Sequence, residues 1–98
     1  FNIGADKYFT LNEVAETVQK IGRKHGYDVS IEHGEPRHEV KHAYCDHTKA
    51  KNILGFEDNT NIEELIDEMF VWSMKQPNRK IKDMDYEITK DMYDYWKK

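Results

Sequence analysis

Residues 10–26, with the sequence TLNEVAETVQKIGRKHG, predict a helix near the start of the chain. Thr10 and Glu13 have the spacing of a capping box, in which each side chain bonds the backbone N–H of the other residue. Apolar residues then recur every three or four positions, as on one face of an amphipathic helix. Gly26 suits the left-handed position that ends many helices. We therefore expect a helix over residues 11–25.

A second capping box precedes the most apolar helical pattern. Thr60 and Glu63 repeat the spacing seen at Thr10, and the pattern stops before Pro77. We expect a helix over residues 61–75, with Thr60 as its N-cap. Its expected buried side chains are Ile62, Leu65, Ile66, Met69 and Trp72.

Two shorter helices complete the predicted set of four. Asp46 can cap a helix over residues 47–54, which Gly55 would end. Apolar residues recur every fourth position near the end of the chain and favour a last helix over residues 87–97.

Short alternating stretches indicate strands between these helices. Residues 1–3 and 29–31 alternate in polarity and are expected to pair near each other, and residues 37–44 have an extended pattern as well. Two or three short strands with about four helices predict a small α/β unit of one domain.

Composition excludes several classes of function. The formal net charge is −4, and acidic and basic residues alternate without the basic block typical of nucleic-acid binders. No apolar run approaches the roughly 20 residues that cross a bilayer, and no signal-peptide pattern is present. Cys45 is the single cysteine, so an internal disulfide is excluded and a reducing, cytoplasmic location is expected.

Common catalytic and phosphate-binding motifs are absent from the sequence. It has no G-x-G-x-x-G or P-loop, no G-x-S-x-G and no H-E-x-x-H. We therefore expect no catalytic residue and no bound dinucleotide in this chain. It also begins at Phe1, inside an expected strand and without an initiator Met, which favours a fragment of a longer protein.

The densest grouping of potentially functional side chains lies in residues 36–46, PRHEVKHAYCD. Arg37 offers a planar fork of donors that suits phosphate oxygens. Glu39 would face the same side of an extended chain, where it orients Arg37 or accepts from a sugar hydroxyl. The pair predicts an anion-binding site.

Two other interpretations of this cluster stay open. One is a solvated edge strand, anchored by Val40 or by Ala43 and Tyr44. The other is a metal site, although the spacing of the ligand-type side chains matches no common zinc motif. Those side chains are His38, His42, Cys45 and His47.

Four stretches resemble, in order, the carboxy-terminal part of the NAD-dependent epimerase/dehydratases of the extended short-chain dehydrogenase/reductase family. The first is FNIG at 1–4 with TLNEVA at 10–15, which resembles (F/Y)-N-(I/L)-G followed by S/T-hydrophobic-x-E/D. The second is RHEV at 37–40, where the family has R-x-G-D-hydrophobic. The third is DHTKAKNILGF at 46–56, similar to D-x-(S/T)-K-A…L-G-(W/Y/F), and the fourth is the helix within 60–72. The closest subgroup is that of the UDP-glucose 4-epimerases.

The resemblance implies roles for three residues. Arg37 matches the arginine that binds the diphosphate of the nucleotide sugar. Glu39 matches the acid that contacts ribose or holds that arginine. Leu11 matches a position that touches the nucleotide base, with core packing as its other interpretation. The second stretch departs from the family because it is one residue shorter, His38 replaces Gly, and Glu39 replaces Asp.

The resemblance also implies how a whole protein would be organised. An NAD-binding Rossmann domain, with its Gly-rich loop and Tyr-x-x-x-Lys pair, would precede residue 1. Residues 1–98 would then be a substrate-binding fragment without that domain, inactive alone and without bound NAD. The whole protein would use NAD on a UDP-sugar and form a homodimer. Three aromatic residues are expected to pack against the missing domain: Tyr93, Tyr95 and Trp96.

A free-standing small α/β binding or interaction domain without catalysis is the alternative interpretation. The two interpretations differ in one observable. A fragment should expose an apolar face where the cofactor domain would sit, whereas a free-standing domain should not.

Overall fold

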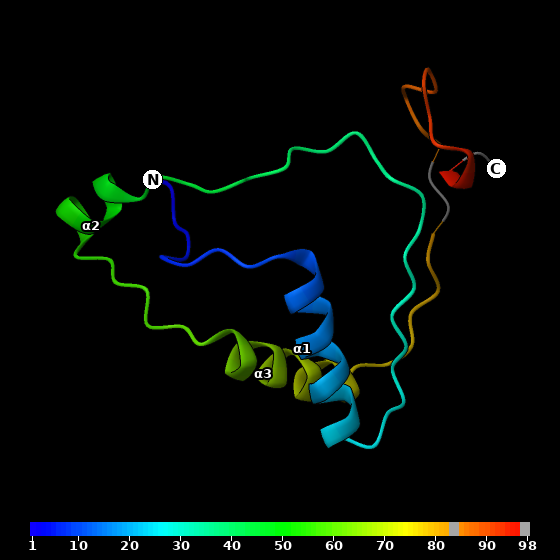
Figure 1. Cartoon of the computed structure of the whole chain (residues 1–98), viewed down its shortest axis with the longest axis horizontal. Helices are drawn as coiled ribbons and strands as arrows, with labels where there is room; N and C mark the ends of the chain where they lie inside the picture. The colour runs from blue at the N-terminus through cyan, green and yellow to red at the C-terminus, as the bar shows by residue number, and fades with distance from the viewer. Residues whose placement is uncertain (83–84, 97–98) are drawn as a thin grey trace.

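The structure is a computed structural model and describes residues 1–82 and 85–96. Its regular elements are α1 (Leu11–Lys24), α2 (Thr48–Leu54), α3 (Ile62–Met74) and the short 3-10 helix η1 (Asp94–Trp96). Figure 1 shows α1 and α3 crossing each other, α2 apart from them, and long irregular segments between the helices. No helix in the described ranges has the length and apolar character needed to cross a membrane.

The predicted α/β class is wrong, because the described residues form helices and no strand. At 29–31 the chain does not join a sheet: Val29 lies against Gly22 of α1, and its carbonyl accepts a hydrogen bond from the Gln19 side chain. At 37–44 a tight turn interrupts the extended pattern, since the Glu39 N–H donates to the Arg37 carbonyl. Residues 1–3 likewise form no strand, so they do not pair with residues 29–31 in a sheet.

The predicted first helix is confirmed, with both halves of its capping box. Thr10 Oγ1 accepts from the Glu13 N–H at 3.1 Å, and the Glu13 carboxylate accepts from the Thr10 N–H at 2.7 Å. Gly26 has a φ of 84°, as expected of a residue that follows a helix end. Gly55 caps α2 in the same left-handed region, with a φ of 65°.

Two helix predictions need correction. Asn61, not Thr60, is the N-cap of α3, and its side-chain oxygen accepts from the N–H groups of Glu63 and Glu64. The expected helix over residues 87–97 is reduced, in its described part, to η1, and residue 97 lies outside the described ranges.

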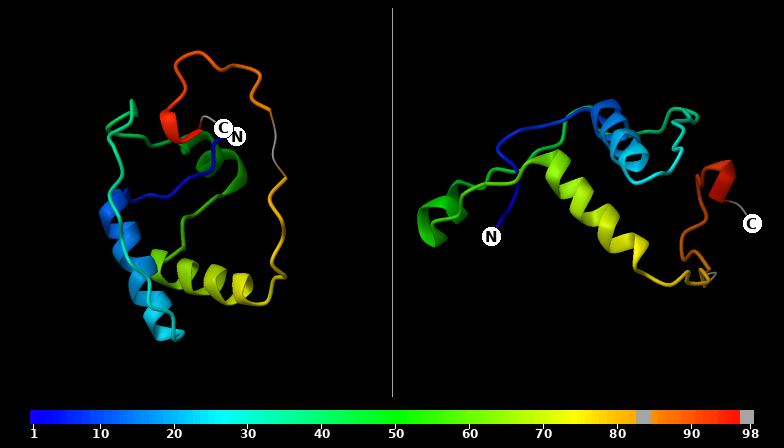
Figure 2. Two further views of the ribbon diagram at one scale, coloured as in Figure 1. Left: turned by 90° about the vertical axis from the view of Figure 1, so that its right-hand side faces the viewer. Right: turned by 90° about the horizontal axis from the view of Figure 1, so that it is seen from below.

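The small core lies where α1 crosses α3. Ile21 of α1 is 2% exposed and is the largest fully buried side chain among the described residues. Beside it, the His25 ring stacks on the Phe70 ring of α3, with centroids 5.4 Å apart. Tyr27 meets the same Phe70 ring edge-on at 5.5 Å. Figure 2 shows the two helices beside each other from two further directions.

Ion pairs line the edge of the same crossing. Lys20 contacts Glu63 at 2.9 Å, and one turn further Lys24 and His25 both contact Asp67. Pairs this close to solvent stabilise little by themselves, so they mainly fix how the two helices are aligned.

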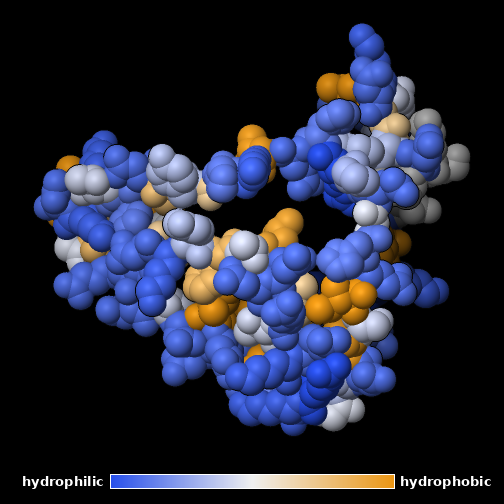
Figure 3. All heavy atoms as spheres, viewed as in Figure 1, coloured by the Kyte–Doolittle hydropathy of each residue, from blue (hydrophilic) through white to orange (hydrophobic). Residues whose placement is uncertain are grey.

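The other face of α3 is apolar and exposed, which corrects the prediction that it is buried. Leu65, Met69 and Trp72 lie at positions i, i+4 and i+7 of the helix and are 43%, 61% and 65% exposed. Ile62 and Ile66 are partly buried, as expected for the side that faces α1. Figure 3 shows apolar residues gathered over the region of α1 and α3.

The chain is much more open than a compact domain of its length. Its radius of gyration is 17.6 Å, whereas about 13 Å is typical of 98 residues. Its accessible surface is 9680 Å², whereas a compact protein of this mass exposes about 5,900 Å². Figure 3 shows the opening enclosed by the long segment between α1 and α2. Helix packing within this chain therefore leaves a large surface uncovered.

Candidate functional site

Arg37 and Glu39 lie side by side on the long segment between α1 and α2. The turn that brings them together is closed by the Glu39 N–H, which donates to the Arg37 carbonyl at 3.0 Å. A guanidinium nitrogen of Arg37 lies 3.9 Å from a Glu39 carboxylate oxygen. Their side chains are 44% and 57% exposed, so the pair is open to solvent. Two of the three predicted site residues are thus in ion-pairing range.

Two rings from the end of the chain pack against Arg37. The guanidinium carbon lies 5.8 Å from the centroid of the Tyr93 ring and 5.8 Å from that of Trp96. These rings meet edge to face, at 89° with centroids 5.3 Å apart, and Tyr86 stacks on Trp96. We call Tyr86, Tyr93 and Trp96 the aromatic cluster. Figures 1 and 2 show the segment that carries it beside the long segment after α1.

A hydrogen bond joins the aromatic cluster to the backbone of the site. The His38 N–H donates to the Tyr93 hydroxyl at 3.0 Å, across 55 residues of sequence. Sequence reasoning missed this contact, because no local pattern connects positions so far apart. The apolar spacing near residue 88 suggested a helix instead. The Tyr95 side chain lies outside the described part of the structure.

Leu11, the third predicted site residue, lies elsewhere in the structure. It is the first residue of α1 and is 80% exposed. It therefore does not belong to the core that this chain forms. Leu11 lies in the first turn of α1, whereas Arg37 and Glu39 lie on the long segment between α1 and α2 (Figure 1).

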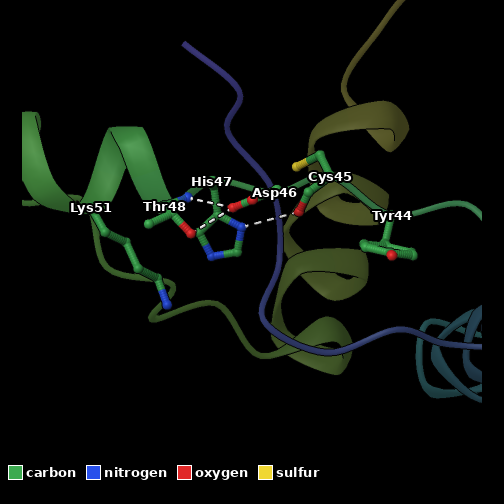
Figure 4. A pocket seen from close by; sticks show the side chains of 6 residues that line it. All are labelled: Tyr44, Cys45, Asp46, His47, Thr48 and Lys51. Carbon is green, nitrogen blue, oxygen red and sulfur yellow. Dashed lines mark hydrogen bonds between the residues drawn. The ribbon is translucent and has the colours of Figure 1, made fainter.

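An open hollow of about 340 Å³ lies at the start of α2 (Figure 4). At its polar side, one carboxylate oxygen of Asp6 accepts from His47 at 2.7 Å and from Lys51 at 2.8 Å. The Asp6 N–H donates to the Asp58 carboxylate at 2.8 Å. These bonds tie three distant segments together, so the hollow is primarily a structural junction. Its lining residues are Tyr44, Cys45, Asp46, His47, Thr48 and Lys51.

Hydrogen bonds to the ionised form lower the pKa of the carboxylates at this junction. Lys51 and then His47 lower the pKa of Asp6. The hydroxyl and N–H of Thr48 lower the pKa of Asp46, which accepts from them at 2.6 and 2.9 Å. The prediction that Asp46 is the N-cap of this helix is wrong by one residue, because His47 is the N-cap of α2 and Asp46, just before it, accepts from the N–H of Thr48.

The metal interpretation of residues 38–47 gains no support. Among the described residues, no group of three or more His, Cys, Asp or Glu side chains is placed to hold a metal ion. The His47 ring instead forms a hydrogen bond with the Asp6 carboxylate. It also meets the Phe56 ring edge-on, with centroids 5.6 Å apart.

No helix start in the described residues follows the Gly-rich turn that is typical of a dinucleotide site. Dinucleotide sites use free N–H groups at a helix start that follows a Gly-rich turn. Here side chains of Thr10, Asp46 and Asn61 already accept from the first-turn N–H groups of α1, α2 and α3.

Comparison with known proteins found one significant relative. The chain is 27% identical over 78 residues, or 79% of its length, to a UDP-glucose 4-epimerase from Caenorhabditis elegans. The match covers 22% of that protein, so the chain corresponds to about a fifth of its relative's length. No model of a protein family matches the chain, and no solved structure matches it. The similarity supports a distant relation to the UDP-glucose 4-epimerases.

Proposed function

We propose that this chain is the substrate-side part of a longer, NAD-dependent nucleotide-sugar epimerase or dehydratase of the UDP-glucose 4-epimerase type. In this proposal Arg37 binds the diphosphate of the nucleotide sugar. The observation that carries it is the similarity to the Caenorhabditis elegans enzyme over 79% of the chain.

The surroundings of Arg37 support its part in the proposal. A guanidinium suits phosphate because its donors match two oxygens at once. Arg37 is 44% exposed and is held against Tyr93 and Trp96 by the faces of their rings. Ring contacts of this kind do not themselves use an N–H donor. Glu39, at 3.9 Å, then orients the guanidinium or accepts from a ribose hydroxyl.

The exposed surface favours a longer protein over a free-standing domain. Leu65, Met69 and Trp72 present an apolar face that α1 does not cover. In soluble proteins such a face commonly marks contact with another domain or protein. The large radius of gyration and accessible surface point the same way. In this proposal a cofactor domain covers the α3 face, and that domain supplies NAD and the catalytic residues.

Leu11 has a subsidiary part in the proposal. Its side chain is 80% exposed at the first turn of α1, where it is accessible to a nucleotide base. Because Leu11 is not grouped with Arg37 in this chain, its contribution is tested separately from that of the diphosphate contact.

The full-length gene product tests the proposal. We expect it to interconvert UDP-glucose and UDP-galactose with NAD, and Arg37→Ala to weaken UDP binding about tenfold or more, the loss of about one charged hydrogen bond. Arg37→Lys should recover only part of the affinity, because an ammonium lacks the planar fork. Arg79→Ala, at an exposed position after α3, is the matched control.

Two results would contradict different parts of the proposal. Unchanged UDP affinity in Arg37→Ala would remove the diphosphate site but leave the family relation intact. A full-length protein that acts on no UDP-sugar and binds no UDP would remove the proposed function itself.

A further inference from the structure

We propose that Tyr93 and Trp96 are positioning residues that hold the Arg37 guanidinium in its binding orientation. This inference rests on the proposed function, because it assigns to Arg37 the diphosphate contact described above. It gives Tyr93 and Trp96, which the sequence predicted to pack against a missing domain, a role within this chain.

The rings of Tyr93 and Trp96 surround the guanidinium on two sides. They meet at 89° and form a corner, and the guanidinium carbon lies 5.8 Å from each centroid. Both distances fall within the roughly 6 Å over which a cation is attracted to a ring face. Two perpendicular rings limit the guanidinium in two directions, which a single stacked ring would not do.

The backbone next to Arg37 is held by the same tyrosine. The Tyr93 hydroxyl accepts from the N–H of His38, the next residue, at 3.0 Å. The Glu39 N–H closes the turn onto the Arg37 carbonyl. The same tyrosine therefore contacts the arginine side chain and fixes the adjacent peptide. Tyr86 stacks on Trp96, with ring centroids 6.3 Å apart, and so helps to hold the Trp96 ring in place.

The segment that carries Arg37 has no regular secondary structure to restrict its side chain. Residues 32–44 run as an irregular, exposed segment between helices, with no regular element to fix a side chain. An arginine on such a segment loses rotamer freedom when it binds a ligand. Contacts that already restrict Arg37 lower this cost, so they raise affinity without touching the ligand.

The experiment is a double-mutant cycle on the full-length gene product, with UDP as the probe in titration calorimetry. Tyr93→Ala and Trp96→Leu should each weaken UDP binding about two- to fivefold, the effect of one exposed cation–π contact. Tyr93→Phe keeps the ring but loses the hydroxyl that accepts from the His38 N–H, so it should weaken UDP binding less than Tyr93→Ala does. Tyr8→Ala, at a tyrosine that is 85% exposed, should bind like the unmodified protein.

The cycle separates positioning from general support of the fold. If the rings act through Arg37, adding Tyr93→Ala to Arg37→Ala should cause no further loss. If Tyr93→Ala reduced UDP affinity equally in the unmodified protein and in Arg37→Ala, the inference would be overturned, because the tyrosine would then act independently of Arg37. Unchanged affinity in Tyr93→Ala, with Arg37→Ala impaired, would overturn the inference but not the proposed function. Unchanged affinity in Arg37→Ala would overturn the diphosphate site and this inference together.

Discussion

Gly22 in α1 lies so close to Val29 that a Cβ atom on the glycine would stand 2.5 Å from Cγ2 of the valine. The contact follows from the way the chain turns after α1. The Tyr27 N–H donates to the Gly22 carbonyl at 2.9 Å, and the Gln19 side chain donates to the Val29 carbonyl at 2.8 Å. The segment after the helix therefore folds back against it at the one position without a side chain.

Gly22→Ala should destabilise the protein by about 1 kcal/mol, although alanine is the better helix former. The expected gain in helix propensity is smaller than the cost of moving Val29, whose β-branched side chain has few alternative rotamers. Denaturant unfolding measures the change in the free energy of unfolding. In the Val29→Ala background the same glycine substitution should cost much less. A stabilising effect of Gly22→Ala alone would show that the segment separates readily from α1.

The caps of α3 offer a test that distinguishes two adjacent residues. Asn61→Ala should cost about 1 kcal/mol, since its side chain accepts from the N–H groups of Glu63 and Glu64. Thr60→Ala should cost clearly less. The Thr60 contact to Asp58 is made by its backbone N–H, which the substitution keeps. The two variants are compared by urea unfolding, followed by circular dichroism. Equal losses of unfolding free energy, or a larger loss in Thr60→Ala, would indicate that Thr60 is the N-cap, as expected from the sequence.

Local features of the fold were predictable, and features that depend on distant contacts were not. The Thr10 cap and the glycines at 26 and 55 act on their own neighbours, so their residue types were sufficient to place helix ends. The alternation at 29–31 is equally local but has two outcomes. Val29 packs against a helix as well as against a strand, and only the tertiary contact at Gly22 decides between them.

The candidate site divides in the same way. Arg37 and Glu39 are two residues apart, and their proximity follows from any extended or turned chain. The contact of Arg37 with the Tyr93 ring depends on a loop closure that leaves no periodic signal in the sequence. The diphosphate role of Arg37 stays a prediction until it is measured.

Acid should destabilise the protein through its hydrogen-bonded carboxylates. Asp6 and Asp67 have pKa values lowered below the ordinary 3.8, by Lys51 and His47 in the first case and by His25 and Lys24 in the second. A carboxyl group with a lower pKa in the folded state binds fewer protons than in the unfolded state. Its stabilising effect is therefore complete above the unfolded pKa and is lost as the pH falls through the folded one.

We expect the urea midpoint to fall as the pH drops below about 4, towards the lowered folded pKa values. Asp6→Asn should lower the midpoint at pH 5 and make its fall at acidic pH shallower, because one of the titrating groups is gone. Asp28→Asn, in the exposed turn after α1, is the control and should follow the unmodified protein. A midpoint that is unchanged down to pH 3 would mean that these contacts are not formed in solution.

Trp72 on the exposed face of α3 tests whether another domain covers this helix. Trp72 is 65% exposed in this chain and Tyr8 is 85% exposed, so truncation of either should have little effect if the chain acts alone. If a cofactor domain covers α3 in a longer protein, Trp72 becomes buried there. Trp72→Ala should then cost the full-length gene product about 2 kcal/mol or more, as for other buried aromatic residues. Tyr8→Ala should cost little in the same protein. Thermal unfolding of the two variants side by side gives the comparison. Equal and small shifts would mean that no domain packs on α3, and the uncovered Leu65, Met69 and Trp72 would then need another partner.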